Sequence, residues 1–282
     1  MPTIAYDATL VALTTPGERD ALLGLPGFTL SEFEALCAES ARLAYVGFDR
    51  TPRERQRLDD ALLRAGMTAS TPIVDAGTDT QAFGTTLPSG HKLVAFRGTQ
   101  PDQLKDLITD AKAFMVPWSV AGRVHQGFAE AFLAIEPALK AFLADDDAPI
   151  FTGHSLGAAL ATLAASVFPG ATLVTIGSPR VGDQAFADHV LASVAVLKRY
   201  VDCSDMITTL PPPFPGFYVH CGDETYIDRD GAISPPLGQP ARAFDQFVAD
   251  ADYVVRYAVK HGDAPTRSLA DHAPINYVRA FS

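Results

Sequence analysis

The chain has 282 residues, of which 48% are hydrophobic and 20% are charged, so it is long and apolar enough to bury a large core. A formal net charge of −11 argues against nucleic acid and anionic membranes as electrostatic partners. No stretch approaches the roughly 20 apolar residues of a spanning helix, and the first residues lack a signal-peptide pattern. We expect a soluble protein of one domain over residues 1–282, with its compartment, secretion as a trimmed form and oligomeric state left open.

Residues 1–70 are expected to supply a covering helix and no catalytic group. Ser31 and Glu34 have the spacing of a capping box, and Phe33, Leu36 and Cys37 lie on one side of the helix that would follow. Further along, residues 81–86 and 92–96 flank a turn at 87–90, which predicts a β-hairpin.

The apolar segment 93–96 runs into Arg97-Gly98-Thr99. A hydrolase needs two N–H donors for a developing oxyanion, and one usually comes from the loop after an early strand. Thr99 is the candidate at this position. The alternative is that Thr99 only caps the helix that follows.

Residues 100–118 carry an amphipathic pattern, with Leu104, Leu107 and Ile108 at helical spacing and Phe114 and Trp118 soon after. Such a helix could gate an apolar cleft, or it could be a surface helix packed permanently on the core. The only tryptophan, Trp118, fits a hinge anchor, a pocket wall or plain packing.

Gly153-His154-Ser155-Leu156-Gly157 lies between a short apolar run and an Ala-rich segment. This is the pattern of a nucleophile elbow, in which glycines allow a strand to reverse sharply into a helix and expose the serine. Ser155 is therefore the candidate nucleophile, and the N–H of Leu156 is the second oxyanion donor. A Gly-bounded serine in an ordinary strand-to-helix turn is the alternative.

Strand-like segments near 150, at 171–176 and at 194–201 alternate with helical ones, which predicts an α/β fold with a mainly parallel sheet flanked by helices. Residues 217–220 and 224–227 suggest a second hairpin. Asp202 and Asp205 both follow the strand at 194–201, where such sheets place catalytic groups. Asp202 is interpreted as a solvated or capping carboxylate.

In this fold the acid and then the base follow the serine along the chain. That order leaves four histidines, His189, His220, His261 and His272. His272 alone lies in a late loop, between Asp271 and Pro274, which makes it the favoured base. His125 and His154 come before the serine or next to it and are assigned to structure.

Residues 234–270 are predicted to form a packed helix whose C-terminal loop delivers His272, with a dimer surface as the alternative. The apolar stripe behind this prediction is Phe244, Phe247, Val248, Ala251, Val255, Ala258 and Val259. Before it, Phe214 lies in a Pro-rich loop that either lines the substrate pocket or is a spacer.

The three cysteines, Cys37, Cys203 and Cys221, allow at most one internal bridge, and reduced thiols are expected, with a Cys203–Cys221 bond as the alternative. No grouping of His, Cys, Asp or Glu has the spacing of metal ligands, so we expect no metal and no cofactor.

Six blocks in one order resemble the fungal-type class 3 lipase family of α/β hydrolases, from about residue 80 to residue 277. The blocks are Phe96-Arg97-Gly98-Thr99, Val124-His125-Gln126-Gly127-Phe128, Gly153-His154-Ser155-Leu156-Gly157, Gly177-Ser178-Pro179-Arg180-Val181-Gly182, Asp205 ahead of Leu210-Pro211-Pro212, and Asp271-His272 with Tyr277. The resemblance implies an α/β-hydrolase fold with a mobile helical lid at about 100–118. It also implies a triad of Ser155, Asp205 and His272.

The function expected on this basis is a serine carboxylester hydrolase of lipase type. It would hydrolyse acylglycerols or related neutral esters at a lipid–water interface, through an acyl-enzyme on Ser155. Two alternatives stay open: a lidded esterase for soluble esters, similar to feruloyl esterases, and a non-catalytic binding module. Acyl chain length is not determined. The segment 234–270 is longer than the family usually needs, and the few cysteines differ from its disulfide-rich fungal members.

Overall fold

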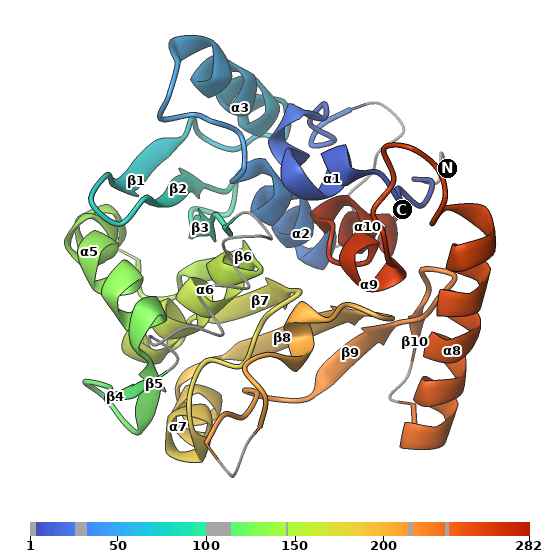
Figure 1. The fold of residues 1–282 in the computed structure, drawn as a ribbon. Coiled ribbons are helices and arrows are strands. Elements are labelled where there is room, and N and C mark those ends of the chain that lie inside the picture. Colours follow the sequence, from blue (N-terminus) through green and yellow to red (C-terminus); the bar gives the residue numbers. More distant parts are fainter. Residues whose placement is uncertain (1–3, 26–32, 100–113, 145, 214–216, 235–236) are drawn as a thin grey trace.

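A computed structural model describes residues 4–25, 33–99, 114–144, 146–213, 217–234 and 237–282 of the chain. Within these residues, eight strands form one sheet and two short strands pair separately (Figure 1). The strands of the sheet are β1 (Thr71–Asp75), β2 (Thr80–Thr86), β3 (Lys92–Phe96), β6 (Ile150–His154), β7 (Thr172–Ile176), β8 (Val196–Asp202), β9 (Glu224–Ile227) and β10 (Ile233–Ser234). The separate pair is β4 (Met115–Pro117) with β5 (Arg123–His125).

Helices cover both faces of the sheet. The α-helices are α1 (Leu10–Thr14), α2 (Phe33–Leu43), α3 (Pro52–Arg64), α5 (Gln126–Leu143), α6 (Leu156–Val167), α7 (Gln184–Ser193), α8 (Gln239–Arg256), α9 (Arg267–Ala270) and α10 (Pro274–Arg279). Short 3-10 turns lie at Pro16–Glu18 and Ile207–Thr209. None of the helices in the described ranges is long and apolar enough to cross a membrane.

The sheet has the order β1-β2-β3-β6-β7-β8-β9-β10. Strands β3, β6, β7, β8 and β9 are parallel, whereas β1, β2 and β10 pair in antiparallel fashion at the two edges. The predicted α/β class, the parallel strands and the hairpin at 81–96 are thus confirmed. Because parallel strands end at the same edge, the loops after β3, β6 and β8 emerge side by side.

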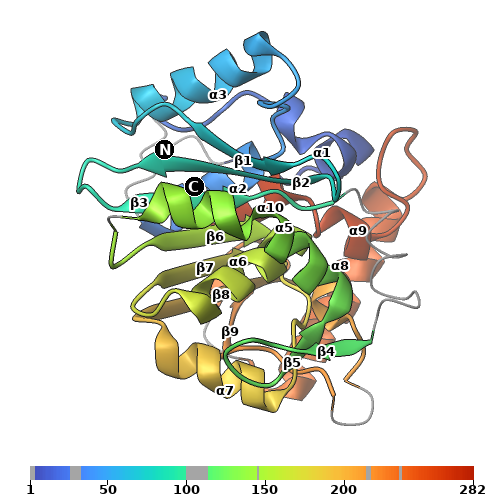
Figure 2. The same cartoon turned by 90° about the vertical axis from the view of Figure 1, so that its left-hand side faces the viewer.

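Alternate residues of each strand feed two separate cores. In β3, Val94 and Phe96 pack with α5 and α6, while Leu93 and Ala95 join the core of α2 and α10. Figure 2 shows the strands one above another, with α5, α6 and α7 covering the nearer face. The predicted covering helix is α2, which packs on β6 and β7, although Ser31 of its capping box lies outside the described residues.

Two sequence-based expectations were wrong, those for residues 217–220 and for the apolar stripe of α8. Residues 217–220 do not pair with 224–227; Val219 bridges Gly182, while β9 pairs in parallel with β8. The helix expected within the lid segment at about 100–118 falls mainly on residues 100–113, which lie outside the described residues, and residues 115–117 form the strand β4. Helix α8 is present, but its Phe- and Val-rich stripe faces outward instead of packing on the core.

Candidate active site

The strand-to-helix turn at Ser155 has the geometry of a nucleophile elbow. Ser155 follows β6 directly, precedes α6 and has φ of 60°, which is strained for a residue with a side chain. A Cβ on Gly153 would lie 2.3 Å from the carbonyl carbon of Gly157, and one on Gly157 would lie 2.1 Å from the carbonyl oxygen of Phe96. Both glycines are therefore needed because backbone segments touch at this turn, as the motif predicts.

His272 lies between Ser155 and Asp205, although 117 and 67 residues separate it from them in sequence. Its Nε2 is 2.9 Å from Ser155 Oγ, and its Nδ1 is 2.9 Å from Asp205 Oδ2. All three side chains are buried. With Nδ1–H donating to the carboxylate, Nε2 is free to accept the serine proton, which is the arrangement a serine nucleophile requires.

Two further donors fix the Asp205 carboxylate. The Ile207 N–H donates to Oδ1 over 2.9 Å, and the Tyr277 hydroxyl donates to Oδ2 over 2.6 Å. Burial and the nearby Asp205 charge raise the pKa of Tyr277 well above its usual range, so this hydroxyl keeps its proton and donates. Tyr277 stood in the motif set, but the residues alone did not predict this bond.

His154, next to the nucleophile, supports the backbone of the base. Its Nε2–H donates to the carbonyl oxygen of His272 over 2.7 Å, and its Nδ1 accepts from the Tyr45 hydroxyl over 2.7 Å. Burial, followed by the proximity of His272, lowers the pKa of His154 well below its usual range, so the ring stays neutral. The structural role expected for His154 is therefore, at least in part, to hold the backbone of His272 in place.

A second buried carboxylate, Asp271, directly precedes the base. It accepts from the Tyr6 hydroxyl (2.7 Å), the Ser204 N–H (2.9 Å) and Arg267 Nε (3.0 Å). These bonds tie the loop of His272 to the loop of Asp205. Sequence reasoning missed this role; its only sequence signal is an Arg four residues before an Asp, which occurs on many helices.

Asp202 was expected to be a solvated or capping carboxylate, and the solvated alternative is wrong. It ends β8 with 3% of its surface exposed, and its Oδ1 accepts from the Cys203 N–H. Burial, and next the charge of Asp271, raise the pKa of Asp202 well above its usual range. Asp202 does not contact His272, so the two aspartates of this loop have different environments.

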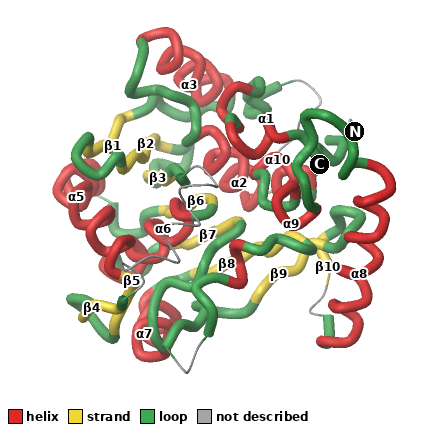
Figure 3. The backbone as a smooth tube through the Cα atoms, viewed as in Figure 1, coloured by secondary structure: helices red, strands yellow, loops and turns green. Residues whose placement is uncertain are grey.

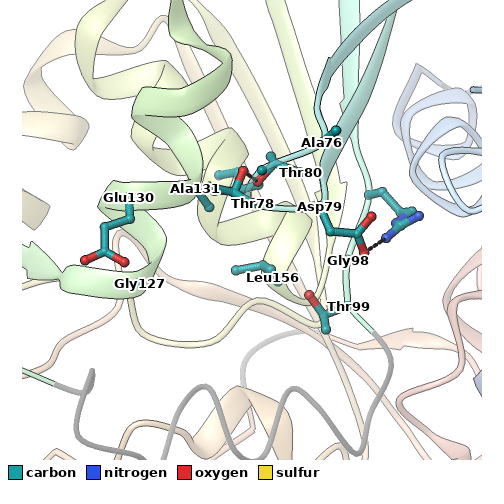
Figure 4. Close-up of a pocket in the computed structure, with 13 residues that line it drawn as sticks. Ala76, Thr78, Asp79, Thr80, Gly98, Thr99, Gly127, Glu130, Ala131 and Leu156 are labelled. Carbon is teal, nitrogen blue, oxygen red and sulfur yellow. Dashed lines mark hydrogen bonds and ion pairs between the residues drawn. The ribbon is translucent and has the colours of Figure 1, made fainter.

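The two expected oxyanion donors line one cavity of about 480 Å³. Thr99 follows β3, and Leu156 is the first residue of α6, where N–H groups have no partner within the helix. Gly98, which lies between β3 and Thr99, is tightly enclosed. A Cβ at this residue would lie 2.1 Å from Tyr45 Oη and 2.6 Å from the His154 carbonyl oxygen. Figure 4 shows Leu156 and Thr99 between the start of α5 and the β1–β2 turn.

The other walls of this cavity are partly polar. Thr78 and Asp79 come from the β1–β2 turn, Thr80 begins β2, and Glu130 and Ala131 come from α5 (Figure 4). Sequence reasoning did not predict this lining, because none of these residues lies in one of the quoted motifs.

Of the six residues expected in the lid or the pocket, the structure describes Phe114 and Trp118. Leu104, Leu107, Ile108 and Phe214 lie outside the described residues. Phe114 is 70% exposed. Trp118 is buried against Phe132 and its Nε1 donates to Ser166 Oγ, so of its three expected roles the structure supports packing.

The remaining histidines are held away from Ser155. His220 contacts the Thr208 carbonyl through Nε2 at 2.8 Å, and His189 contacts the Ser166 carbonyl at 2.9 Å. His125 caps α5 by accepting from the Gly127 N–H, which confirms its structural assignment. His261 lies exposed beyond α8.

All three cysteines are free and buried, so the alternative of a Cys203–Cys221 bond is wrong. Burial raises the pKa of both of these thiols to about 12, which keeps them protonated and unreactive at neutral pH. Among the residues the structure describes, no three His, Cys, Asp or Glu side chains are grouped as metal ligands.

Comparison with known proteins finds a sequence family that matches part of the chain. The family model for class 3 lipases matches residues 93–214, the stretch that holds Thr99, Ser155 and Asp205. A lipase of Rhizomucor miehei is 33% identical over 151 residues, which is 48% of this chain and 41% of that protein. A secreted mono- and diacylglycerol lipase of Fusarium solani is 39% identical over 116 residues, 37% of this chain and 34% of that protein.

Solved structures agree with these matches. The propeptide complex of Rhizomucor miehei lipase superposes with a TM-score of 0.55 at 26% identity, covering 69% of this chain and 66% of that one. A mutant form of MDLA from Penicillium cyclopium gives a TM-score of 0.56 at 25% identity, covering 76% of this chain and 83% of that one. The matched segments span less than half the length of the curated relatives. By its motifs, its fold and these likenesses, the chain is similar to the fungal-type class 3 lipases and has their α/β-hydrolase fold.

Proposed function

We propose that this protein is a serine carboxylester hydrolase of lipase type that acts on acylglycerols or related neutral esters. One observation carries the proposal: His272 is 2.9 Å from Ser155 Oγ on one side and 2.9 Å from Asp205 Oδ2 on the other. A hydroxyl, an imidazole and a carboxylate in that order activate serine as a nucleophile.

The reaction would proceed in two halves. His272 Nε2 takes the Ser155 proton as Oγ attacks the ester carbonyl, and then gives that proton to the leaving alcohol. Water, deprotonated by the same nitrogen, attacks the acyl-enzyme and releases the acid and Ser155. Asp205 holds the Nδ1–H tautomer and stabilises the imidazolium that forms in each half.

The carbonyl oxygen becomes an oxyanion in both halves. We propose that the backbone N–H groups of Thr99 and Leu156 receive it, because both residues line the cavity beside the elbow. The N-terminus of α6, 12 residues long, adds the positive end of a helix dipole at the same point. Gly98 permits the close approach of the Thr99 loop to the elbow.

The substrate class rests on the relatives and on charge. The similar proteins carry names of triacylglycerol, mono- and diacylglycerol lipases, and uncharged esters suit a chain with a net charge of −11. We propose a lipid–water interface as the place of action, a lid at about 100–118 and one hydrolase domain over residues 1–282.

A second candidate is an esterase for soluble esters with polar acyl groups. The lining of the cavity by Thr78, Asp79, Thr80 and Glu130 favours it, because hydroxyls and carboxylates match polar substituents better than a long acyl chain. The third alternative, a non-catalytic module, is opposed by the hydrogen-bonded arrangement of all three groups.

A series of p-nitrophenyl and glycerol esters of increasing chain length, assayed below and above their solubility limits, tests the proposal. A hydrolysis rate that rises once the ester concentration exceeds the solubility limit supports a lipase. A rate that saturates below the solubility limit supports the soluble-ester esterase. An organophosphonate should label the protein but not Ser155→Ala, while Ser178→Ala, another buried serine, should be labelled normally. Absence of labelling in the folded protein would support the non-catalytic module.

A further inference from the structure

Helix α8 carries an apolar surface that is exposed to solvent and does not pack on the rest of the protein. The residues it buries are Asp245, Ala249 and Tyr253. We define its outer face as the residues on the opposite side, which are Phe244, Phe247, Val248, Ala251, Val254 and Val255. Phe244, Phe247, Val254 and Val255 are 66%, 71%, 62% and 81% exposed. Large apolar side chains gathered in this way mark an interaction surface more often than a structural accident.

The outer face is uncharged and has an acidic border. At about 100° per residue, its side chains lie within about 60° of Ala251, and Asp250 and Asp252 lie about 100° away on either side. Asp252 is paired with Arg256 at 2.8 Å, whereas Asp250 is exposed. Together with the net charge of −11, this border disfavours an anionic membrane.

A second copy of the chain is a poor occupant of this face. An 18-residue helix is about 27 Å long and about 10 Å wide, so it offers roughly 270 Å², against about 800 Å² per partner in a stable dimer. Two outer faces packed antiparallel would also bring Asp250 of each copy close to Asp250 of the other. Like charges across the contact would weaken it further.

The inner side of α8 is attached to the loop that holds Asp205. Gln246 Nε2 donates to the Cys203 carbonyl over 2.6 Å, and Asp245 accepts from the Tyr226 hydroxyl over 2.9 Å. The C-terminal end of α8 leads through one loop to α9 (Figure 3), and His272 lies two residues after the end of α9 in sequence. Only the width of α8, about 10 Å, would therefore separate a surface that held the outer face from the loop that carries the acid. Residues 239–256 also lie outside the stretch matched by the family model.

We propose that the outer face of α8 docks on an uncharged lipid–water surface and holds the enzyme there. The helix lies along the edge of the molecule (Figure 1), so its apolar side chains can enter the lipid boundary while its inner side stays packed on the fold. This inference rests on the proposed function, because a neutral ester phase is the surface on which such docking would be useful.

Vesicle binding tests the inference without catalysis. In a Ser155→Ala background, sedimentation with phosphatidylcholine vesicles containing trioctanoin is measured for Phe247→Ser/Val255→Ser and for a matched control, Leu133→Ser/Leu191→Ser. The control residues are 52% and 47% exposed on α5 and α7. The double variant in the outer face replaces two large apolar side chains with small polar ones, so we expect affinity to fall about ten-fold or more, with the control unchanged.

Three results would overturn the inference: equal binding by both double variants, tighter binding of the parent to phosphatidylglycerol vesicles, or a parent dimer in sedimentation velocity that only the α8 variant dissociates. Turnover of a soluble p-nitrophenyl ester by the same double variants with Ser155 intact should be unchanged. If that turnover is absent in the parent as well, the proposed function fails while the vesicle result still decides the role of α8.

Discussion

Two buried carboxylates, Asp205 and Asp271, lie on either side of the peptide that carries the base, and their environments are opposite. Asp205 accepts from His272, Tyr277 and a backbone N–H, and its only ion-pair partner in the described residues is His272. Asp271 is paired permanently with the Arg267 guanidinium and accepts from Tyr6 and a backbone N–H. A carboxylate with no arginine or lysine beside it can stabilise a positive charge that forms on the imidazole. A carboxylate whose charge is already balanced by an arginine serves to hold loops together.

The largest effect is expected for Asp205→Asn. Asparagine cannot hold the Nδ1–H tautomer or stabilise the imidazolium, so kcat should fall on the order of 10⁴-fold. Steady-state hydrolysis of a soluble ester measures this, with circular dichroism to confirm folding. A decrease of less than ten-fold would mean that Asp205 is not the catalytic acid.

Asp271→Asn should instead act on stability. It leaves the Arg267 guanidinium buried without its anion, which typically costs about 3–5 kcal/mol of unfolding free energy. Urea unfolding measures the loss. Below the unfolding transition, kcat should stay within about ten-fold of the parent, because His272 keeps Asp205. A catalytic loss as large as that of Asp205→Asn, without loss of stability, would erase the distinction between the two carboxylates.

The two tyrosines offer a smaller and matched comparison. Tyr277→Phe removes a donor to Asp205 and should lower kcat about ten-fold, whereas Tyr6→Phe removes a donor to Asp271 and should cost about 1–2 kcal/mol of stability. Measuring kcat and urea midpoints for both variants separates the roles. Tyr277→Phe with full kcat would show that this bond does not orient the acid.

Asp202→Asn should have the smallest effect on catalysis. The pKa of Asp202 is raised in the folded protein, so its contribution to stability is fully present below the unfolded pKa of about 3.9 and is lost as pH rises towards the folded value. The parent should therefore lose stability relative to Asp202→Asn as the pH rises above about 4 in urea titrations. A pH-independent difference between the two proteins would contradict the raised pKa.

Local patterns predicted the elbow and the fold class because their causes are local. Two glycines around Ser155, strands alternating with helices, and the chain order of serine, acid and base all leave marks in the sequence. The Tyr6–Asp271 contact leaves none, because it joins residues 265 positions apart, and the Arg267–Asp271 pair leaves only a spacing that occurs on many helices. Residues 224–227, which form β9, were wrongly predicted to pair with 217–220, because parallel pairing between β8 and β9 has no local signature.

The orientation of α8 shows a different limit. Its sequence carries an apolar stripe, and hydrophobicity alone assigns that stripe to the core. The buried side instead contains Asp245, whose desolvation is offset by Tyr226, Arg229 and the Cys203 thiol. A buried side chain stabilised by partners from distant segments cannot be recognised from periodicity. The outward apolar stripe of α8 is thus a feature that none of the sequence motifs predicts.

The bond between Tyr6 and Asp271 has a consequence for biosynthesis. Tyr6 leaves the ribosome 265 residues before Asp271, so this contact can form only after the segment that carries His272 has been made. Until then Ser155 has no imidazole beside it. On the proposed function, ester cleavage would begin only after this late segment has docked, and a nascent chain would not yet attack lipid.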